Sequence, residues 1–294
     1  MGNNARVLTS EQRPQFVTHY NRSSFAFDHS LHLLDIFDVP QLVAMSGRLP
    51  DQAYYSTADS VVSDGWKHVG ERRAPLAQTL ETLSETNSLV LLKHCEKDSE
   101  YGGVFRRLMD EVVEQVGDEL RSDLDVGRAT LVISSPRRVT SYHIDAEVNF
   151  LLQVRGRKLL HAFDPSDRRI LTESELEAFY GGDSDGARYK SDRQSEARVF
   201  ALTPGMGIHL PLHAPHWAQN LDDVSVGVSL NFNLRSGTRL AKLYKVNNRL
   251  RRAGMAPASP GVSAWLDSLK LAAFDGASHC RQLVRHRSVK AALS

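Results

Sequence analysis

The sequence predicts a mainly β protein with helices on either side of a central, strand-rich region. Residues 130–235 are a succession of short apolar segments separated by turn-forming residues, which is typical of strands. The segments before and after this region place apolar residues at helical spacing instead. A third observation is the run 224–233, in which every second residue is apolar. We therefore expect a β core with N-terminal α/β elements and C-terminal helices.

The alternating run also predicts what lies on each side of its strand. Its apolar positions are Val224, Val226, Val228, Leu230 and Phe232. Its other positions are Ser225, Gly227, Ser229, Asn231 and Asn233. Because side chains alternate between the two faces of a sheet, the apolar face belongs in a hydrophobic core. The small polar face suits the wall of a ligand cavity inside a barrel, and a face open to solvent is the alternative.

A tight hairpin is predicted in the centre of the strand-rich region. The apolar runs 148–154 and 157–163 flank Arg155-Gly156, and two-residue turns with glycine are common between paired strands. In that hairpin Gln153 would lie opposite Lys158.

Helical spacing is found over Val39–Arg48, Gly103–Gly117, 240–250 and 265–274. Pro75 leads into the segment Leu76–Ser84, and Leu89–Leu92 is expected to be a short buried strand. A short helix is also expected over Glu173–Tyr180, because Thr172 and Glu175 form a capping box and Gly181-Gly182 follows. Residues 184–198 are polar and are expected to form a surface loop, and 254–261 a connector.

The bulk composition is that of an ordinary globular protein. The chain has 294 residues and a formal net charge of +1, so a nucleic-acid partner is not expected. Cys95 and Cys280 make no disulfide framework, which favours reduced thiols in the cytoplasm. No apolar run is long enough for a membrane span, and residues 1–10 contain no apolar signal core.

The C-terminal region is locally basic. It contains Arg249, Arg251, Arg252, Arg281, Arg285, His286, Arg287 and Lys290. Interleaved leucine and alanine favour solvated helix faces, and a patch for an anionic partner is the alternative.

His143 and Asp145 are the first candidates for chemistry. Residues two apart in a strand point the same way, so an imidazole and a carboxylate converge. A second histidine from another strand would complete the 2-His-1-carboxylate triad of non-haem Fe(II) oxygenases. The spacing alone occurs often by chance. His209, His213 and His216 are all candidates for the second histidine.

The same strand parity predicts one continuous functional face. It would carry His143, Asp145, Glu147, Asn149, Leu151 and Gln153. The predicted hairpin adds Lys158 to this face. A buried ammonium is unfavourable without an anionic partner, and a cosubstrate carboxylate would supply one. The alternative is that Lys158 extends its ammonium to the barrel rim.

These residues carry a resemblance to a known family. The matching positions are Thr140, His143-Ile144-Asp145, Asn149-Phe150, Gly156-Arg157-Lys158, Pro211 with His216, and Asn231. In this spacing the segment resembles the JmjC-type, cupin-like Fe(II)- and 2-oxoglutarate-dependent oxygenases, which include the hypoxia-inducible-factor asparaginyl hydroxylase and bacterial cupin-like proteins. Weaker similarity extends upstream, from His19-Tyr20 to Leu49-Pro50.

The resemblance implies a double-stranded β-helix, a jelly-roll barrel, with its core at about 130–235 inside a domain of residues 1–235. It implies Fe(II) on His143, Asp145 and His216, where the spacing from Pro211 favours His216 over His213. It implies that 2-oxoglutarate is bound by Lys158 and Thr140, in a pocket lined by Asn149 and Asn231. Two departures alter the packing near the ligand: Ala214 stands where the family has tryptophan, and Gly205-Met206 where it has Gly-Asp.

The implied reaction consumes 2-oxoglutarate and O2 and yields succinate and CO2, with hydroxylation of a protein side chain or a small molecule. N-methyl-lysine demethylation and a non-catalytic cupin-type binding protein are the alternatives. Residues 236–294 carry two apolar stripes, formed by Leu240, Leu243 and Leu250 and by Trp265, Leu269 and Phe274. We expect a homodimer through these helices; helices folded back onto their own barrel are the alternative.

Overall fold

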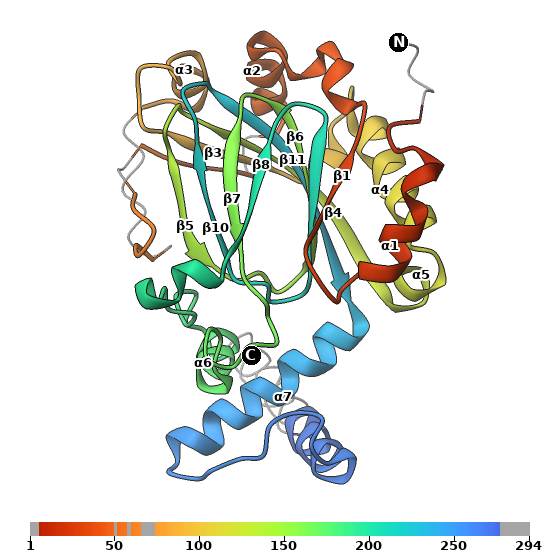
Figure 1. Cartoon of the computed structure of the whole chain (residues 1–294), viewed down its shortest axis with the longest axis vertical. Helices are drawn as coiled ribbons and strands as arrows, with labels where there is room; N and C mark the ends of the chain where they lie inside the picture. Colours follow the sequence, from red (N-terminus) through yellow and green to blue (C-terminus); the bar gives the residue numbers. More distant parts are fainter. Residues whose placement is uncertain (1–5, 50–51, 58–59, 66–73, 277–294) are drawn as a thin grey trace, which may run out of the picture.

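The computed structural model describes residues 6–49, 52–57, 60–65 and 74–276, which form two facing antiparallel sheets with flanking helices (Figure 1). The larger sheet consists, in spatial order, of β1 (Phe25–Asp28), β9 (Met206–Leu210), β6 (Val148–Arg155), β11 (Ser225–Leu234), β4 (Leu124–Ser134), β3 (Leu89–Lys93) and β2 (Ala53–Ser56). The smaller sheet consists of β5 (Val139–His143), β10 (His216–Asn220), β7 (Lys158–Ala162) and β8 (Arg198–Leu202).

The order of the strands along the chain identifies the winding. From β4 to β7 the chain changes sheet at every connection, and after β8 it does so again through β9, β10 and β11. A chain that passes repeatedly between two antiparallel sheets forms a jelly roll. The predicted fold class, mainly β with a double-stranded β-helix, is confirmed.

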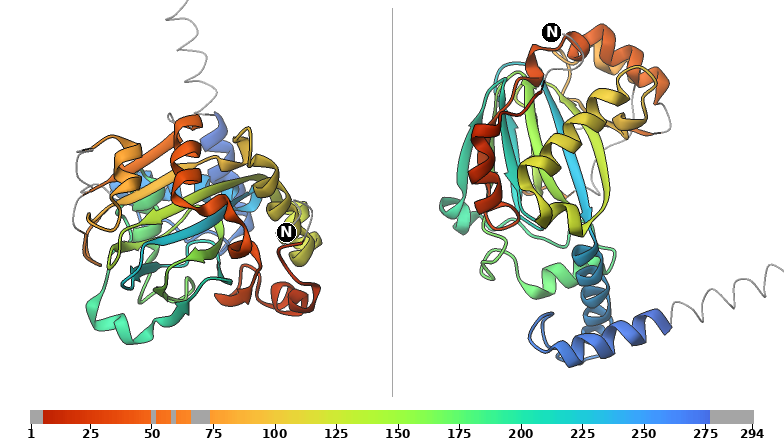
Figure 2. Two further views of the ribbon diagram at one scale, coloured as in Figure 1. Left: turned by 90° about the horizontal axis from the view of Figure 1, so that it is seen from above. Right: turned by 90° about the vertical axis from the view of Figure 1, so that its right-hand side faces the viewer.

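The main hydrophobic core lies outside the barrel. The helices are α1 (Arg13–His19), α2 (Val39–Arg48), α3 (Leu76–Glu81), α4 (Gly102–Val116), α5 (Asp118–Asp123), α6 (Glu173–Tyr180) and α7 (Arg235–Arg252). Phe16 of α1 and Phe105 of α4 are fully buried against the outer face of the larger sheet, where Phe150 and Phe232 meet them. Figure 2 shows α1 and α4 on this side.

The alternating strand lies as predicted. Val226, Val228, Leu230 and Phe232 of β11 belong to this outer core. Ser229 and Asn231, on the opposite face, line a cavity between the sheets. The cavity interpretation of the polar face is therefore confirmed.

The predicted hairpin is wrong. Both strands form close to the expected bounds, but β6 belongs to the larger sheet and β7 to the smaller one. Lys158 lies opposite Asn220 and Leu202, and Gln153 opposite Gly227. Periodicity identifies a strand and its faces, whereas the choice of partner depends on sheets assembled from distant segments. A two-residue glycine turn serves an arch between sheets as well as a hairpin.

Several helices agree with the sequence. α2 and α6 have the predicted bounds, and α4 begins and ends one residue earlier than predicted. The capping box of α6 is present: the Glu175 N–H donates to Thr172 Oγ1 at 3.2 Å, and the Thr172 N–H donates to Glu175 Oε2 at 2.8 Å. The polar segment 184–198 is largely a loop but contains a 3-10 helix, η7 (Ser191–Glu196).

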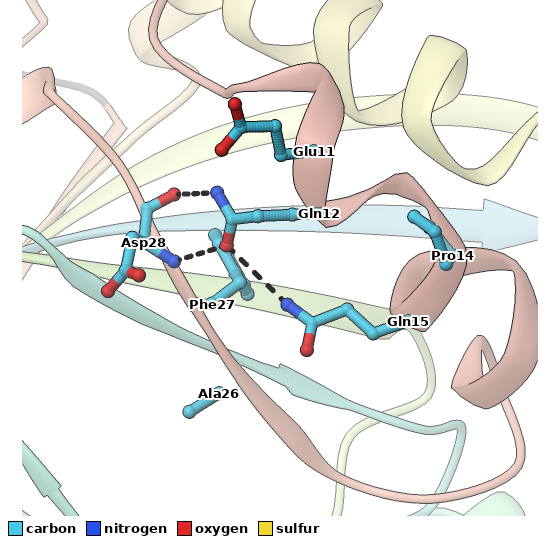
Figure 3. Close-up of a pocket in the computed structure, with 7 residues that line it drawn as sticks. All are labelled: Glu11, Gln12, Pro14, Gln15, Ala26, Phe27 and Asp28. Atoms are coloured by element: carbon cyan, nitrogen blue, oxygen red, sulfur yellow. Dashed lines mark hydrogen bonds between the residues drawn. The ribbon is translucent and has the colours of Figure 1, made fainter.

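A side chain covers the outer edge of β1 (Figure 3). Gln12 Oε1 accepts a hydrogen bond from the Asp28 N–H at 2.6 Å, and Gln12 Nε2 donates to the Asp28 carbonyl at 2.8 Å. The amide therefore pairs with this edge strand as a neighbouring backbone would. An edge occupied in this way is less available for pairing with another chain.

The C-terminal helices divide between packing and exposure. Leu243 and Tyr244 of α7 are buried, and Arg251 pairs with the buried carboxylate of Glu177 in α6. The helix over 264–276 instead exposes Trp265 (71%) and Leu269 (56%).

The two cysteines and the basic C-terminal residues lie partly inside and partly outside the described residues. Cys95 is buried and unpaired, and burial raises the pKa of its thiol to about 12. Cys280 and the basic residues of 281–290 lie outside the described residues. Among the helices in the described part of the chain, none combines the length and apolar character that a membrane span requires.

The turn between β6 and β7 generates a stability prediction. Gly156 has φ of 67°, and a Cβ there would lie 2.3 Å from the Val224 carbonyl oxygen. We expect Gly156→Ala to reduce the free energy of unfolding by about 2–4 kcal/mol, measured by urea denaturation. Gly254→Ala is the matched control, because Gly254 has φ of 83° and open space around it. Equal losses in the two variants would show that the contact with Val224 is not responsible.

Candidate metal centre

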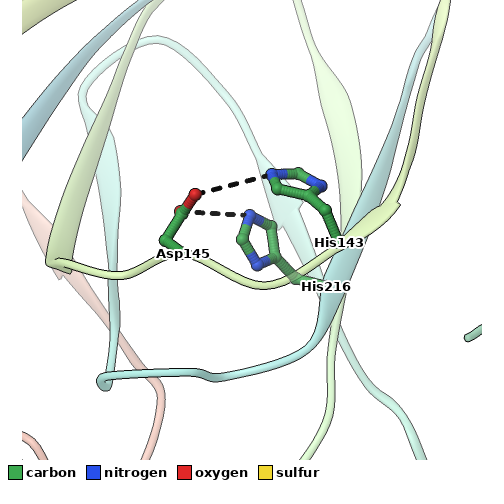
Figure 4. Close-up of side chains that lie close together, drawn as sticks. All are labelled: His143, Asp145 and His216. Atoms are coloured by element: carbon green, nitrogen blue, oxygen red, sulfur yellow. Dashed lines mark ion pairs between the residues drawn. The ribbon is translucent and has the colours of Figure 1, made fainter. Parts of the chain in front are cut away.

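Three side chains of the predicted set converge at one end of the barrel. His143 is the last residue of β5, His216 is the first residue of β10, and the two lie directly opposite in the antiparallel pair. Asp145 follows β5 by two residues and turns toward both (Figure 4). Its two carboxylate oxygens lie 4.0 Å from His143 Nε2 and 3.9 Å from His216 Nε2. The three ligand atoms all lie within 4.8 Å of one another, close enough to hold one ion.

Backbone carbonyls set the tautomer of both histidines. His143 Nδ1 lies 2.7 Å from the Ser141 carbonyl, and His216 Nδ1 lies 2.9 Å from the Ala214 carbonyl. A carbonyl only accepts, so each Nδ1 carries the proton. Each Nε2 is then left with its lone pair directed at the centre, the arrangement that a ligating histidine requires.

The protonation states fit a divalent cation. Burial lowers the pKa of His143 and of His216 to about 4, so both rings are neutral at pH 7. Burial also raises the pKa of Asp145, because a carboxylate is unfavourable in a site without a nearby cation. Two neutral imidazoles and one carboxylate are the donor set of the facial triad, and a metal ion would compensate the buried carboxylate.

The other candidate histidines lie elsewhere. His209 Nε2 accepts the Asn21 N–H at 2.9 Å, and its ring packs on Phe150 in the outer core. His213 has φ of 63°, and its Nε2 lies 2.5 Å from the Tyr180 hydroxyl. Neither histidine lines the cavity that contains the triad.

A cavity of about 580 Å³ extends from the triad between the two sheets. All four residues expected to contact 2-oxoglutarate line it: Thr140, Asn149, Lys158 and Asn231. Of the predicted functional face, Glu147 and Leu151 line it as well. Gln153 does not, because its amide donates to Ser225 Oγ at 2.9 Å and to the Arg155 carbonyl.

Lys158 occupies the inner part of this cavity. It lies opposite Asn220, four residues further along β10 than His216, and it is 4% exposed. Beyond the cavity lining at this end, Asn220 Nδ2 joins the two sheets by donating to Ser134 Oγ and to the Ser135 carbonyl, both at 2.8 Å. No described carboxylate pairs with Lys158, and burial alone lowers its pKa to about 8. A buried ammonium without a partner marks a place for an anion.

Two asparagines, Asn149 and Asn231, line the same cavity as the triad and Lys158. Asn149 Nδ2 donates to Ser229 Oγ at 2.6 Å and to Asn231 Oδ1 at 2.7 Å. The buried Asn149 Oδ1 has no hydrogen-bond partner among the described residues. It is therefore available to a ligand that carries a donor.

Sequence reasoning missed the cavity residues contributed by β3 and β4. These are Leu89, Leu91, Lys93, Arg128, Thr130 and Val132. A weak signal was present, because Arg128, Thr130 and Val132 alternate with residues that face the other way. Only the pairing of β4 with β11 turns that parity toward the cavity.

Comparison with known proteins identifies relatives of this fold. No family model matches the chain. Human HSPB1-associated protein 1 is 24% identical over 163 residues, covering 52% of this chain and 33% of that protein. The bovine protein of that name is 24% identical over 165 residues, 53% of this chain and 34% of its own length. The chain thus matches about a third of these relatives' length.

Solved structures extend the likeness. The Escherichia coli ribosomal oxygenase YcfD, in complexes with cobalt and succinic acid and with cobalt and 2-oxoglutarate, superimposes with a TM-score of 0.52 at 14% identity. Each match covers 92% of this chain and 67% of the other. The chain therefore has the fold of the JmjC-type, cupin-like oxygenases.

Lys158 should reduce stability while no anion is bound. Because its folded pKa of about 8 lies below the ordinary 10.5, the folded state holds the proton less tightly than the unfolded state. Below pH 8 the penalty is fully present, and it disappears as the pH rises toward 10.5. We expect Lys158→Met to stabilise the metal-free protein at pH 7 by about 1–3 kcal/mol, with the gain shrinking at high pH. The exposed Lys97→Met is the control in the same thermal unfolding series, and an unchanged or lower melting temperature for Lys158→Met would contradict the burial penalty.

Proposed function

We propose that this chain is an Fe(II)- and 2-oxoglutarate-dependent dioxygenase with His143, Asp145 and His216 as metal ligands. The observation that carries the proposal is that an open metal triad and a buried, unpaired ammonium share one cavity. A dicarboxylate that reaches both a metal and Lys158 meets both requirements. Iron with bound 2-oxoglutarate would supply the oxidising chemistry: O2 and 2-oxoglutarate give succinate and CO2, and a substrate C–H becomes C–OH.

The chain's own residues would bind and orient the cosubstrate. Lys158 would donate to the carboxylate remote from the metal, and the hydroxyl of Thr140 would donate to the same group. Asn149 and Asn231, joined by their hydrogen bond, would line the pocket between this carboxylate and the metal. The hydrogen bonds of Asn220 to Ser134 and Ser135 tie the two sheets together at the Lys158 end, which would limit the entry of water there.

We further propose that the substrate is a side chain of a protein. Support comes from the fold neighbours, whose names describe them as ribosomal oxygenases. If 2-oxoglutarate occupied part of the cavity of about 580 Å³, the remaining space would suit a substrate group as small as one side chain. Small-molecule hydroxylation, lysine demethylation and ligand binding without catalysis are the competing outcomes.

The assembly we propose is a homodimer through the C-terminal helices. The stripe on α7 is largely used within the chain, because Leu243 is buried and Leu240 packs beside Tyr244. The apolar residues of 264–276 supply the remaining surface, where Trp265 and Leu269 are exposed. Exposed apolar side chains gathered on one helix favour burial against a second copy.

The metal and cosubstrate assignment has a spectroscopic test. Anaerobic protein with Fe(II) and 2-oxoglutarate should develop a weak visible charge-transfer band. His216→Ala should abolish the band and Fe(II) binding, whereas His213→Ala should retain both. Lys158→Ala should keep Fe(II) affinity but weaken 2-oxoglutarate about 10- to 100-fold, because a charge-assisted contact is lost.

Other results would contradict the assignment. Equal loss in His213→Ala and His216→Ala would remove the support for His216 as ligand. An unchanged 2-oxoglutarate affinity in Lys158→Ala would show that the cosubstrate binds elsewhere. A band without succinate formation, across peptide and metabolite pools, would favour a binding protein.

The dimer is tested by sedimentation equilibrium of the full chain at micromolar concentration. We expect a dimer for the wild type and a monomer for the double variant Trp265→Glu and Leu269→Glu. Val199→Glu is the control, because Val199 is an exposed apolar residue of β8, at 54% exposure. A monomeric wild type would refute the homodimer.

A further inference from the structure

Arg128 is a charged residue of the cavity that neither the triad nor the proposed cosubstrate site uses. It extends from β4 into the cavity and is half-buried. No described residue forms an ion pair or a hydrogen bond with the Arg128 guanidinium, although the Arg128 backbone lies opposite Asn231 in the β4–β11 pair. Lys93, on the neighbouring strand β3, lines the same wall. A guanidinium directed into a cavity without a partner is a binding site for an anion.

The strand register places Arg128 near the open end, on the side of the triad. Ser134, which accepts the hydrogen bond from Asn220, marks the closed end of β4. Arg128 lies six residues before Ser134, which is about 20 Å along a strand. It lies opposite Asn231 of β11, and Asn231 lies opposite Asn149 of β6. Arg128 is therefore remote from the inner end that Lys158 occupies.

The carboxylate of Glu147 does not form an ion pair with the Arg128 guanidinium. Glu147 lines the cavity from the segment after Asp145. Burial, with the nearby charge of Asp145, raises the Glu147 pKa, and the charge of Arg128 opposes that rise only in part. The two side chains form no ion pair within 4.0 Å, unlike the ion pairs that Arg48 and Arg251 form with acidic residues elsewhere. The charge of Arg128 thus remains available to a ligand.

The charge balance of the cavity with metal and 2-oxoglutarate bound also favours an anionic ligand for Arg128. The two carboxylates of 2-oxoglutarate would be taken by the metal and by Lys158, and Asp145 would be taken by the metal. Among the described charged residues that line the cavity, Arg128, the exposed Lys93 and Glu147 then remain, which leaves an excess of positive charge. Burial strengthens the preference for an anion, because the local dielectric is lower than that of water.

We propose that Arg128 binds a carboxylate of the primary substrate, so that the carbon to be oxidised lies close to that carboxylate. This inference rests on the proposed dioxygenase function and specifies its substrate class. The shared chemistry is a carboxylate one or two carbons from the oxidised C–H, as in an aspartyl or glutamyl side chain of a protein or in a free carboxylic acid. The reaction balances as before: the C–H becomes C–OH while O2 and 2-oxoglutarate give succinate and CO2.

The experiment compares matched pairs of substrates with the full-length protein, Fe(II) and 2-oxoglutarate. One arm uses peptides with a central Asp or Glu against the same peptides with Asn or Gln, and a second arm uses short carboxylic acids against their amides. Acidic members of one arm should raise succinate formation at least about tenfold over their amides. Acidic peptides alone would identify a protein side chain, and free acids alone a metabolite.

Variants connect that preference with Arg128. Arg128→Gln should lower kcat/KM for the acidic substrate about 10- to 100-fold while leaving the KM for 2-oxoglutarate within about twofold. Arg128→Lys should restore part of the loss. The matched control is Arg239→Gln, because Arg239 is exposed on α7 outside the cavity and should not change either constant.

A binding measurement separates this inference from the function on which it rests. The same peptide and acid pairs are titrated by calorimetry into wild type, Arg128→Gln and Arg239→Gln, without oxygen and with Fe(II) and 2-oxoglutarate present, so that the cosubstrate occupies Lys158 and no turnover takes place. Tighter binding of the acids that is lost only in Arg128→Gln supports the inference independently of turnover. Equal binding of acids and amides, or equal binding by wild type and Arg128→Gln, overturns it. Absence of the Fe(II)–2-oxoglutarate band in wild type would instead refute the dioxygenase.

Discussion

Burial of the larger sheet's outer face by helices α1, α2 and α4 is the constraint on which the rest of this structure depends. Phe16, Phe105, Phe150 and Phe232 meet there and are fully buried. A jelly roll normally needs the space between its sheets for apolar side chains. Because this protein builds its main core on the outside, the inner face of β11 can carry serine and asparagine, and the interior can remain a polar cavity.

The cavity is unfavourable for the folded state when it is empty of ligands. Two histidines are held neutral, a carboxylate is held against its preference for water, and the Lys158 ammonium has no anion. Near pH 7 the carboxylate and the ammonium cost stability that the external core must offset, whereas the neutral histidines cost stability only as the pH falls below about 6.5. Such groups persist where a ligand repays the cost on binding. The arrangement therefore favours a function in which a cation at the triad and an anion at Lys158 bind together. The distance between these two sites would determine which anions can reach both.

Much of the fold could be predicted from local chemistry. The capping box at Thr172 and Glu175 and the apolar spacing of α2 involve contacts within one turn or two, so the sequence contains them completely. The alternation in β11 identifies both of its faces for the same reason. The predicted pairing of β6 with β7 was wrong because the partner of a strand depends on the packing of segments that lie far apart in the chain. The periodicity of a strand contains no information about its partner.

The candidate site also has one part that the sequence could predict and another that required the tertiary structure. The sequence by itself determined the chemical inventory: His143 and Asp145 on one strand face, a lysine two residues after a glycine turn, and three histidines of which one had to be the partner. Only the tertiary structure decided that β10 sets His216 opposite His143, that His213 contacts Tyr180 and His209 the outer core, and that Lys158 enters from the other sheet. It also added Arg128, which no motif marks. The physical reason is that side-chain direction within a strand is local, whereas convergence on one point requires the register between strands that lie far apart in the chain.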